Sequence, residues 1–289
     1  MTQHEWRSAG GFLLPLVVLV VLFILLPVLG TFRTSFFLDV PFRPRRFIGL
    51  ENYLVLWNDP AFWRSIKFTL LFVLVSVPLE TGLGLLTALV LNEALPLRGT
   101  LRACVLIPWA IPAAVSGRVF ELVYNTSYGA ANYLLMRFGV LREPANWLGS
   151  EGTAFAALVA ADAWKTTPFA AIILLAGLSS IPEDLYRQAV VDRAGLMQRF
   201  TRITLPLLKP VLVVTILFRS VEALRIFDVV YVLTGGGPGG STSSLSLLGY
   251  RYFSSGDFGY GSAISVVLFL AALVLSVAYV RVGGFSGEG

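Results

Sequence analysis

The chain has 289 residues, of which 56% are hydrophobic and 13% charged, with a formal net charge of +5 and a mean hydropathy of +0.77. A soluble domain could not leave so much apolar surface in water, so this composition predicts an integral membrane protein. With one cysteine and one histidine, the chain can build neither an intrachain disulfide nor a Cys/His metal cluster. It contains no basic run of the kind that binds nucleic acid, and we expect no nucleic-acid partner.

Apolar segments long enough to cross the hydrocarbon layer, which takes about 20 helical residues, recur along the chain. They predict an all-α, polytopic fold in which residues 1–289 form a single membrane domain. The first segment lacks a small-residue cleavage site and a polar face, so we expect a retained, lipid-facing helix. The six expected spans are Gly11–Phe32, Ile66–Leu91, Thr100–Tyr124, Ala154–Leu178, Pro206–Leu233 and Phe258–Val282.

The second and third spans contain residues that lipid does not tolerate freely. An ionised Glu80 must face the protein interior or an aqueous cavity. It belongs either to a transport pathway or to a structural hydrogen bond with a neighbouring helix. Pro108 and Pro112 free backbone carbonyls and predict a kink in the third span. Arg118 and Glu121, three residues apart, are expected to pair on one helix face.

The segment from 125 to 152 carries Tyr128, Tyr133 and Trp147. Exposed aromatic residues are typical of a docking surface and equally of an aromatic belt at the membrane interface, and both interpretations stay open. In the fourth span that follows, the three-residue spacing of Asp162 and Lys165 predicts an ion pair.

Ser180–Pro206 is a long polar stretch between two apolar runs and predicts a helix outside the membrane. Ser180 and Glu183 have the spacing of a capping box, Pro182 suits a first turn, and Gly195 is expected to end the helix. An apolar stripe on a helix outside lipid predicts a protein partner. The stripe consists of Leu185, Tyr186, Ala189 and Val190.

The fifth span is the most polar of the six. Its four charged residues alternate in sign at three-residue steps, so each could bridge to the next over three helical turns, and all must face inward. This ladder either packs helices together or lines a polar pore beside Phe227 and Tyr231. The four residues are Arg219, Glu222, Arg225 and Asp228. The glycine-rich segment that follows, 234–242, lacks the lysine and the preceding strand of a phosphate-binding loop.

The polar stretch also resembles a known motif, the coupling loop (EAA motif) of ABC-importer permeases. The matching positions are Tyr186, Ala189, Asp192, Ala194, Phe200, Ile203, Leu205 and Pro206. Arg187 stands in place of the motif's glutamate, Gln188 in place of an alanine and Arg193 in place of a glycine. The resemblance implies that residues 180–206 form a cytoplasmic loop with a short helix that docks into a cleft of an ATPase subunit. The implied coupling residues are Tyr186, Arg187, Ala189, Asp192, Ala194, Gly195 and Phe200.

The resemblance extends over nearly the whole chain, from Leu14 to Val282, and is closest to permeases of the maltose/trehalose kind. The stretches that carry it are Trp164–Phe169, Arg225–Asp228 and Tyr231–Gly236, with similar segments at 47–53, 59–63 and 258–264. It implies one half of a pathway for a sugar, such as the disaccharides trehalose or maltose, that works by alternating access. The residues that it brings to the substrate pathway are Trp164, Lys165, Phe169, Glu222 and Arg225.

The same resemblance implies the partners of the chain and its place in the cell. It implies a second, homologous permease, an ABC ATPase dimer that binds the ATP, and an extracellular or periplasmic sugar-binding protein. The chain itself would be no enzyme and would hold no cofactor. It would lie in the bilayer of the cytoplasmic (inner) membrane with both termini in the cytoplasm. Lys and Arg divide equally between the two expected sides, so this orientation depends on the motif.

Two other classes of membrane protein agree less well with the sequence. An ion-coupled secondary transporter would show inverted halves with matched broken helices, which are not evident. An intramembrane enzyme needs a nucleophile with a base, or a metal site, and the sequence contains no HExxH or GxSxG motif.

Overall fold

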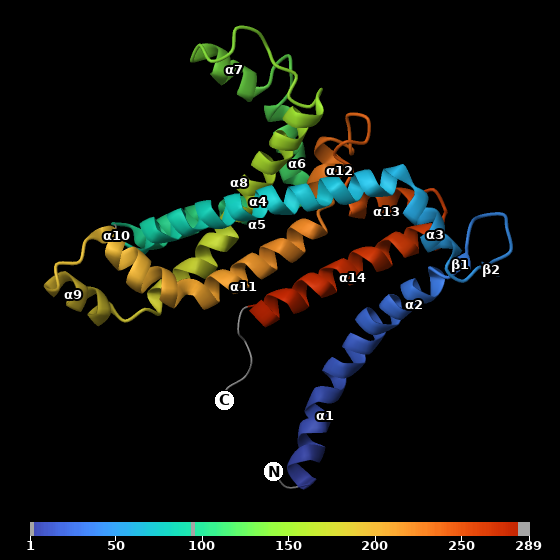
Figure 1. The fold of residues 1–289 in the computed structure, drawn as a ribbon, viewed down its shortest axis with the longest axis horizontal. Helices are drawn as coiled ribbons and strands as arrows, with labels where there is room; N and C mark the ends of the chain where they lie inside the picture. Colours follow the sequence, from blue (N-terminus) through green and yellow to red (C-terminus); the bar gives the residue numbers. More distant parts are fainter. Residues whose placement is uncertain (1–2, 94–95, 283–289) are drawn as a thin grey trace. The chain divides into compact units, whose positions relative to one another are not determined.

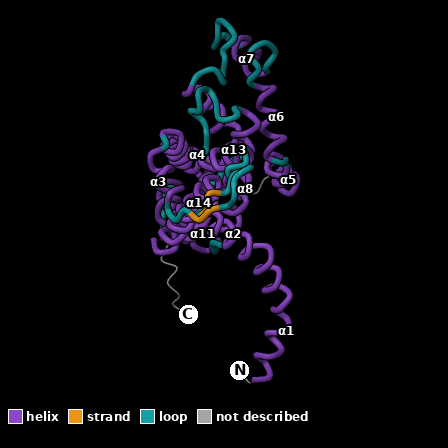
Figure 2. The backbone as a smooth tube through the Cα atoms, turned by 90° about the vertical axis from the view of Figure 1, so that its right-hand side faces the viewer, coloured by secondary structure: helices purple, strands orange, loops and turns teal. Residues whose placement is uncertain are grey.

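The computed structural model describes residues 3–93 and 96–282, which are mostly helical (Figures 1 and 2). Within this part of the chain, strand occurs only as an antiparallel hairpin of β1 (Phe37–Leu38) and β2 (Arg46–Phe47). The predicted all-α class is confirmed. The helices are α1 (Gln3–Val20), α2 (Leu26–Thr34), α3 (Glu51–Asn58), α4 (Pro60–Asn92), α5 (Arg98–Ala110), α6 (Ala113–Val123), α7 (Ala130–Arg137), α8 (Glu151–Ser179), α9 (Glu183–Val191), α10 (Leu196–Arg199), α11 (Leu205–Leu224), α12 (Asp228–Leu233), α13 (Leu245–Ser254) and α14 (Phe258–Val282).

Four helices of the described chain are long and apolar enough to cross a membrane. They are the segment Phe12–Thr34, α4, α8 and most of α14. No residue in the apolar window of Phe12–Thr34 is buried by the rest of the chain, as expected of a lipid-facing helix. The pair α5 and α6 makes a fifth candidate, but it is bent by 89°. The bend lies at Ile111 and Pro112, so the kink predicted from the two prolines is confirmed.

The fifth expected span, Pro206–Leu233, is not one continuous helix. Its first part, α11, ends at Leu224, and the chain is helical again only from Asp228. The count of six spans therefore stays a prediction.

The described chain groups into two compact units, one of residues up to 62 with 248–270 and one of residues 63–247 with those from 271 onwards. In the first unit, the buried Asn52 of α3 donates its amide to the Phe37 carbonyl at 3.0 Å. Asp59, just before α4, accepts hydrogen bonds from the hydroxyls of Tyr260 at 3.0 Å and Tyr252 at 3.4 Å. The first bond joins α3 to β1, and the other two hold Asp59, between α3 and α4, to α13 and α14. The prediction of a single domain is not tested by this grouping.

The second unit packs α8 against α4 and α11 through small residues. A Cβ added to Gly84 of α4 would lie 2.8 Å from the Cβ of Ala170 on α8. One added to Gly177 of α8 would lie 2.7 Å from a methyl group of Leu208 on α11. Small residues of this kind let membrane helices approach closely and pack by van der Waals contact.

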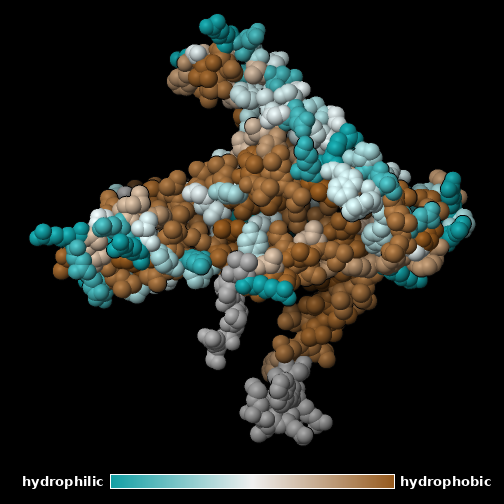
Figure 3. Space-filling view, viewed as in Figure 1, coloured by the Kyte–Doolittle hydropathy of each residue, from teal (hydrophilic) through white to brown (hydrophobic). Residues whose placement is uncertain are grey.

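Helix α8 separates the two polar ends of this unit. At 1.5 Å per residue its 29 residues extend about 44 Å, more than the roughly 30 Å of hydrocarbon. In Figure 1, α9 and α10 lie at one end of α8 and the segment with α7 lies at the other. Hydrophilic residues gather at both ends in Figure 3, and hydrophobic residues cover most of the helices between them. The segments 125–150 and 180–204 therefore lie at opposite ends of a helix that is long enough to cross the membrane.

Candidate functional site

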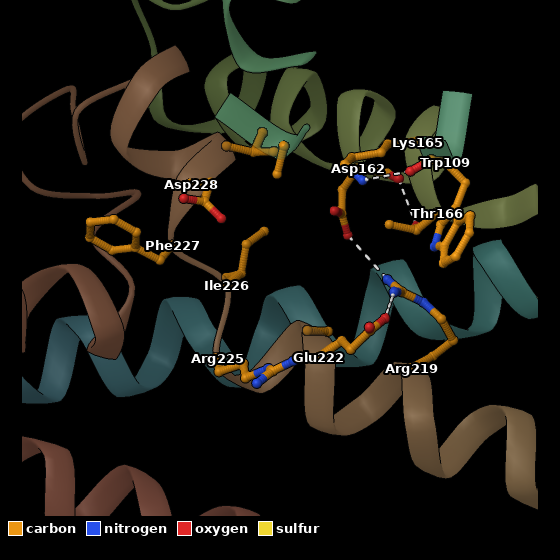
Figure 4. Close-up of a pocket in the computed structure, with 13 residues that line it drawn as sticks. Trp109, Asp162, Lys165, Thr166, Arg219, Glu222, Arg225, Ile226, Phe227 and Asp228 are labelled. Atoms are coloured by element: carbon orange, nitrogen blue, oxygen red, sulfur yellow. Dashed lines mark hydrogen bonds and ion pairs between the residues drawn. The ribbon is translucent and has the colours of Figure 1, made fainter. Parts of the chain in front are cut away.

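A cavity of about 360 Å³ lies where α11 gives way to α12, beside α8 and the bend between α5 and α6 (Figure 4). Three acidic and three basic side chains line it, so the charges of its wall balance. These are Asp162, Lys165, Arg219, Glu222, Arg225 and Asp228. Trp109, Thr166 and Phe227 add two aromatic rings and a hydroxyl to the wall.

The cavity exists because the backbone leaves the helical conformation after Leu224. Arg225 caps α11 with φ −97° and ψ 20°, and Phe227 precedes α12 with φ −137°. A break inside a membrane protein frees carbonyl groups that need other partners. The buried hydroxyl of Ser244 donates to the freed carbonyl of Ile226 at 2.7 Å. This hydrogen bond stabilises the break.

Arg219 is the centre of a buried ion cluster that joins three helices. Its guanidinium lies 2.6 Å from a carboxylate oxygen of Glu80 on α4 and 3.4 Å from one of Asp162 on α8. It also pairs with Glu222 on its own helix, and the last two of these carboxylates are drawn with it in Figure 4. Arg219 and Glu80 expose 1% and 0% of their side chains, and each charge can stay buried only because the other is near.

Glu80 therefore has the partner that the sequence alone did not reveal. Of its two interpretations, the bond to a neighbouring helix is the one that the structure supports. The partner lies 139 residues further along the chain.

The predicted charge ladder is wrong beyond its first step. Arg219 and Glu222 pair as expected, but α11 ends before Arg225 and α12 begins at Asp228. Within the described residues, no ion pair joins Glu222 to Arg225 or Arg225 to Asp228. The ladder required one continuous helix, and the break removes it.

The predicted ion pair between Asp162 and Lys165 is also wrong. Asp162 lies against Arg219, and Lys165 donates through Nζ to the backbone carbonyl of Trp109 at 3.4 Å. Because α5 ends one residue after Trp109, this carbonyl has no following helical turn to bond. The predicted pair of Arg118 and Glu121 is confirmed, at 2.5 Å.

The structure brings three of the five expected pathway residues to the cavity, namely Lys165, Glu222 and Arg225. Trp164 is not among the residues that line it and packs edge-on against Phe120, with 5.5 Å between ring centroids. Phe169 lies behind the wall, where it stacks on the ring of Trp109 at 5.7 Å. The role of these five residues in transport stays a prediction.

Sequence reasoning did not select Trp109 or Thr166 as site residues. A signal existed for Trp109, which lies between the two prolines that predicted the kink. Thr166 follows Lys165 directly, and its hydroxyl bonds the backbone carbonyl of Asp162 at 2.7 Å. Nothing in the sequence connects Ser244 with the break that it stabilises.

The expected coupling loop contains α9 and α10, but its predicted helix signals are partly wrong. Ser180 caps the end of α8 and Pro182 is the N-cap of α9, so the capping box from Ser180 to Glu183 does not form. Gly195 does not end α9 but begins α10 as its N-cap. Tyr186 of α9 shares a 2.9 Å hydrogen bond with the hydroxyl of Thr204.

Helix α9 ends instead at Val191, and Arg193, two residues further on, adopts φ +55°. The N–H of Ala194 bonds the Ala189 carbonyl at 2.8 Å and that of Arg193 bonds the Val190 carbonyl at 3.0 Å. This is a Schellman motif, whose left-handed position is usually glycine because a Cβ is strained there. The glycine-to-arginine departure from the coupling motif therefore falls at the position that most favours glycine.

Arg193→Gly is expected to stabilise the end of α9 by about 1 kcal/mol, because it removes the Cβ strain. Amide hydrogen exchange in α9 should slow about five-fold at that energy. Gln188→Gly, an exposed change inside the same helix, is the matched control and should speed exchange. Equal or faster exchange in Arg193→Gly would contradict the assignment of strain.

Comparison with known proteins agrees with this geometry. The family model described as "Binding-protein-dependent transport system inner membrane component" matches residues 80–283. The trehalose/maltose transport system permease protein MalF of Thermococcus litoralis is 54% identical over 288 residues, with 98% of this chain and 97% of MalF covered. The sulfoquinovosyl glycerol transport system permease protein SmoG of Agrobacterium fabrum is 41% identical, with 96% and 92% covered. A similar fold is found in a chain of a solved bacterial ABC transporter, which is involved in the import of the acidic polysaccharide alginate. The TM-score is 0.85 and the identity 24%, with 99% of this chain and 98% of that chain covered.

The family match and the apolar helices together define a multi-pass transport component of the ABC-importer type. The chain belongs to the family of binding-protein-dependent transport system inner membrane components. This confirms the predicted class and decides against an ion-coupled secondary transporter and an intramembrane enzyme.

Proposed function

We propose that the chain forms one half of the pathway by which an ATP-driven importer carries a sugar, a disaccharide such as trehalose or maltose, across the membrane. The observation that carries the proposal is the cavity at the break between α11 and α12. It combines charges of both signs with an aromatic wall and lies within the segment that matches the family. The 54% identity to a trehalose/maltose permease supports the choice of substrate.

The chemistry of the cavity suits an uncharged polyol. Sugar hydroxyls both donate and accept hydrogen bonds, and bonds to charged groups are the stronger ones. Lys165 and Arg225 can donate, and Glu222 and Asp228 can accept. The exposed face of Trp109, backed by its stacking on Phe169, can pack against a pyranose ring.

Transport would follow alternating access, a two-state change biased by ATP binding in a partner. The partners that we propose are a second, homologous permease, an ATPase dimer docked on α9, and a sugar-binding protein on the other side of the membrane. ATP would bind to the ATPase and not to this chain. The exposed residues Val190, Val191, Leu196 and Met197 on the coupling loop are consistent with a docking surface.

The direct test is uptake by proteoliposomes that contain this chain with its partner subunits and binding protein. Labelled trehalose or maltose should accumulate only with ATP and should not respond to a sodium or proton gradient. Uptake driven by an ion gradient without ATP would overturn the proposal.

Gly195→Trp is expected to lower ATP-coupled uptake at least ten-fold while the chain still inserts and assembles with its sister permease. A Cβ at Gly195 meets no atom within 4 Å, so the change adds bulk to the exposed coupling loop without strain. Gly30→Trp has the same open surroundings in the lipid-facing helix and is the matched control. Normal coupled uptake by Gly195→Trp would show that this part of the loop does not contact the ATPase.

The proposed orientation places α9 and both termini in the cytoplasm. In a Cys104→Ser background, Ser127→Cys should react with an impermeant maleimide added from outside, and Met197→Cys should not. Both positions are exposed in the structure, so access alone would not explain a difference. The reverse pattern of labelling would require the opposite orientation.

A further inference from the structure

A second and larger cavity, of about 940 Å³, lies in the same unit but shares no lining residue with the charged one. Its wall is formed by the beginning of α4, the beginning of α8 and the glycine-rich segment 238–241. It therefore lies at the end of α8 opposite to α9, which is an end that faces water or lipid headgroups. The function proposed above does not use it.

Two basic side chains, Arg64 and Lys67, line this cavity from one face of α4. Neither takes part in an ion pair within residues 3–93 and 96–282. Glu151 is the acidic residue of the wall and is exposed, so the lining has a surplus of one positive charge. The wall of the charged cavity, by contrast, carries equal numbers of acidic and basic side chains.

The start of α8 adds hydrogen-bond donors beside these charges. Ser150 caps the helix by accepting from the N–H of Thr153, and the wall includes the first two helical residues, Glu151 and Gly152. N–H groups in a first turn have no partner within their helix and favour an anion. The hydroxyl oxygen of Ser241, on the facing segment, is buried with no hydrogen-bond partner in the described chain.

The rest of the wall is apolar. Phe68 and Phe155 meet edge to face, with 6.0 Å between ring centroids, and Leu71 is 45% exposed one turn further along α4. A small water-soluble anion would gain no binding energy from this apolar surface. A molecule with an anionic head and a hydrocarbon chain can use both parts of the cavity.

We propose that this cavity binds an anionic phospholipid. Its phosphate lies against Arg64, Lys67 and the beginning of α8, and its acyl chain follows Phe155 and Leu71 along α4 into the bilayer. A lipid bound in this cavity would contact the glycine-rich segment, α4 and α8, but not the charged cavity.

The test measures lipid binding to the assembled transporter, purified and stripped of lipid, by native mass spectrometry during titration with phosphatidylglycerol. Arg64→Gln with Lys67→Gln should weaken binding of the tightest bound lipid roughly ten-fold or more, because both basic side chains near the lipid phosphate lose their charge. Arg137→Gln with Arg142→Gln, two exposed residues of the 125–152 segment outside the cavity, should leave binding unchanged.

A second variant keeps the charges and fills the space. A Cβ at Gly152 meets no atom within 4 Å, so Gly152→Phe enters the cavity without strain and should lower lipid binding by a similar factor. Two further titrations identify the ligand. Phosphatidylcholine with the same chains should bind more weakly, and inorganic phosphate should not displace the bound lipid.

Three results would overturn the proposal. Undiminished phosphatidylglycerol binding in both cavity variants would place the lipid elsewhere. Equal binding of phosphatidylcholine would indicate ordinary lipid around the helices. Displacement by inorganic phosphate would assign the cavity to a soluble anion.

Discussion

Arg219→Met is expected to destabilise the subunit by about 3–5 kcal/mol, the range found when one partner of a buried ion pair is removed. Glu80, with no exposed surface, and Asp162 would lose the guanidinium that compensates their charges. A loss of this size is a large part of the free energy of unfolding of a typical domain. We therefore expect a lower melting temperature of the assembled transporter and a smaller yield of it.

Arg225→Met is the matched control for this change. It removes a guanidinium from the end of the same helix, where no ion pair holds it among the described residues. It should leave assembly and melting temperature nearly unchanged. If both variants melt alike, the buried cluster does not stabilise the subunit as the geometry indicates.

Glu222→Gln combined with Arg225→Gln is expected to reduce sugar uptake strongly in a transporter that still assembles. Both side chains keep their approximate size, but two charged groups of the cavity wall become neutral. A hydrogen bond to a charged group contributes about 1.5–3 kcal/mol, so the loss of one bond to the sugar lowers apparent affinity about ten-fold or more. Uptake as a function of sugar concentration measures this change.

Arg118→Gln with Glu121→Gln provides the control for this pair. It makes the same two substitutions at the same three-residue spacing, in an exposed ion pair outside the cavity. It should transport normally. Normal uptake by the Glu222 and Arg225 double variant, with unchanged substrate preference and intact assembly, would exclude these residues from the pathway.

The sequence was enough to predict the class of fold. Hydrophobic runs locate membrane helices because the bilayer fixes their length, and the kink follows from Pro108 and Pro112 through local chemistry alone. The pairing of Glu80 could not be predicted, since its partner Arg219 is brought to it only by the packing of α4 on α8 and α11.

The cavity was harder to predict than the helices. Residues 225–227 contain neither proline nor glycine, so no local signal marks the break between α11 and α12. Because the break was not predicted, the three-residue spacing of the four charged residues indicated a continuous ladder of ion pairs. A hydrogen bond from Ser244, which lies beyond α12, stabilises the break, and such a bond has no sequence pattern.

The cluster around Arg219 also has a mechanical consequence. The Arg219 side chain forms ion pairs that join α4, α8 and α11. We therefore expect these three helices to move together as one rigid body. Tyr186 of α9 is hydrogen-bonded to Thr204, the residue just before α11. This bond lies at the opposite end of α11 from the break. If the proposed ATPase partner displaces α9, we expect the displacement to be transmitted along α8 and α11 with little bending. Most of the bending would then occur at Ile111 and at residues 225–227. Both sites border the charged cavity, so bending there would open or close it.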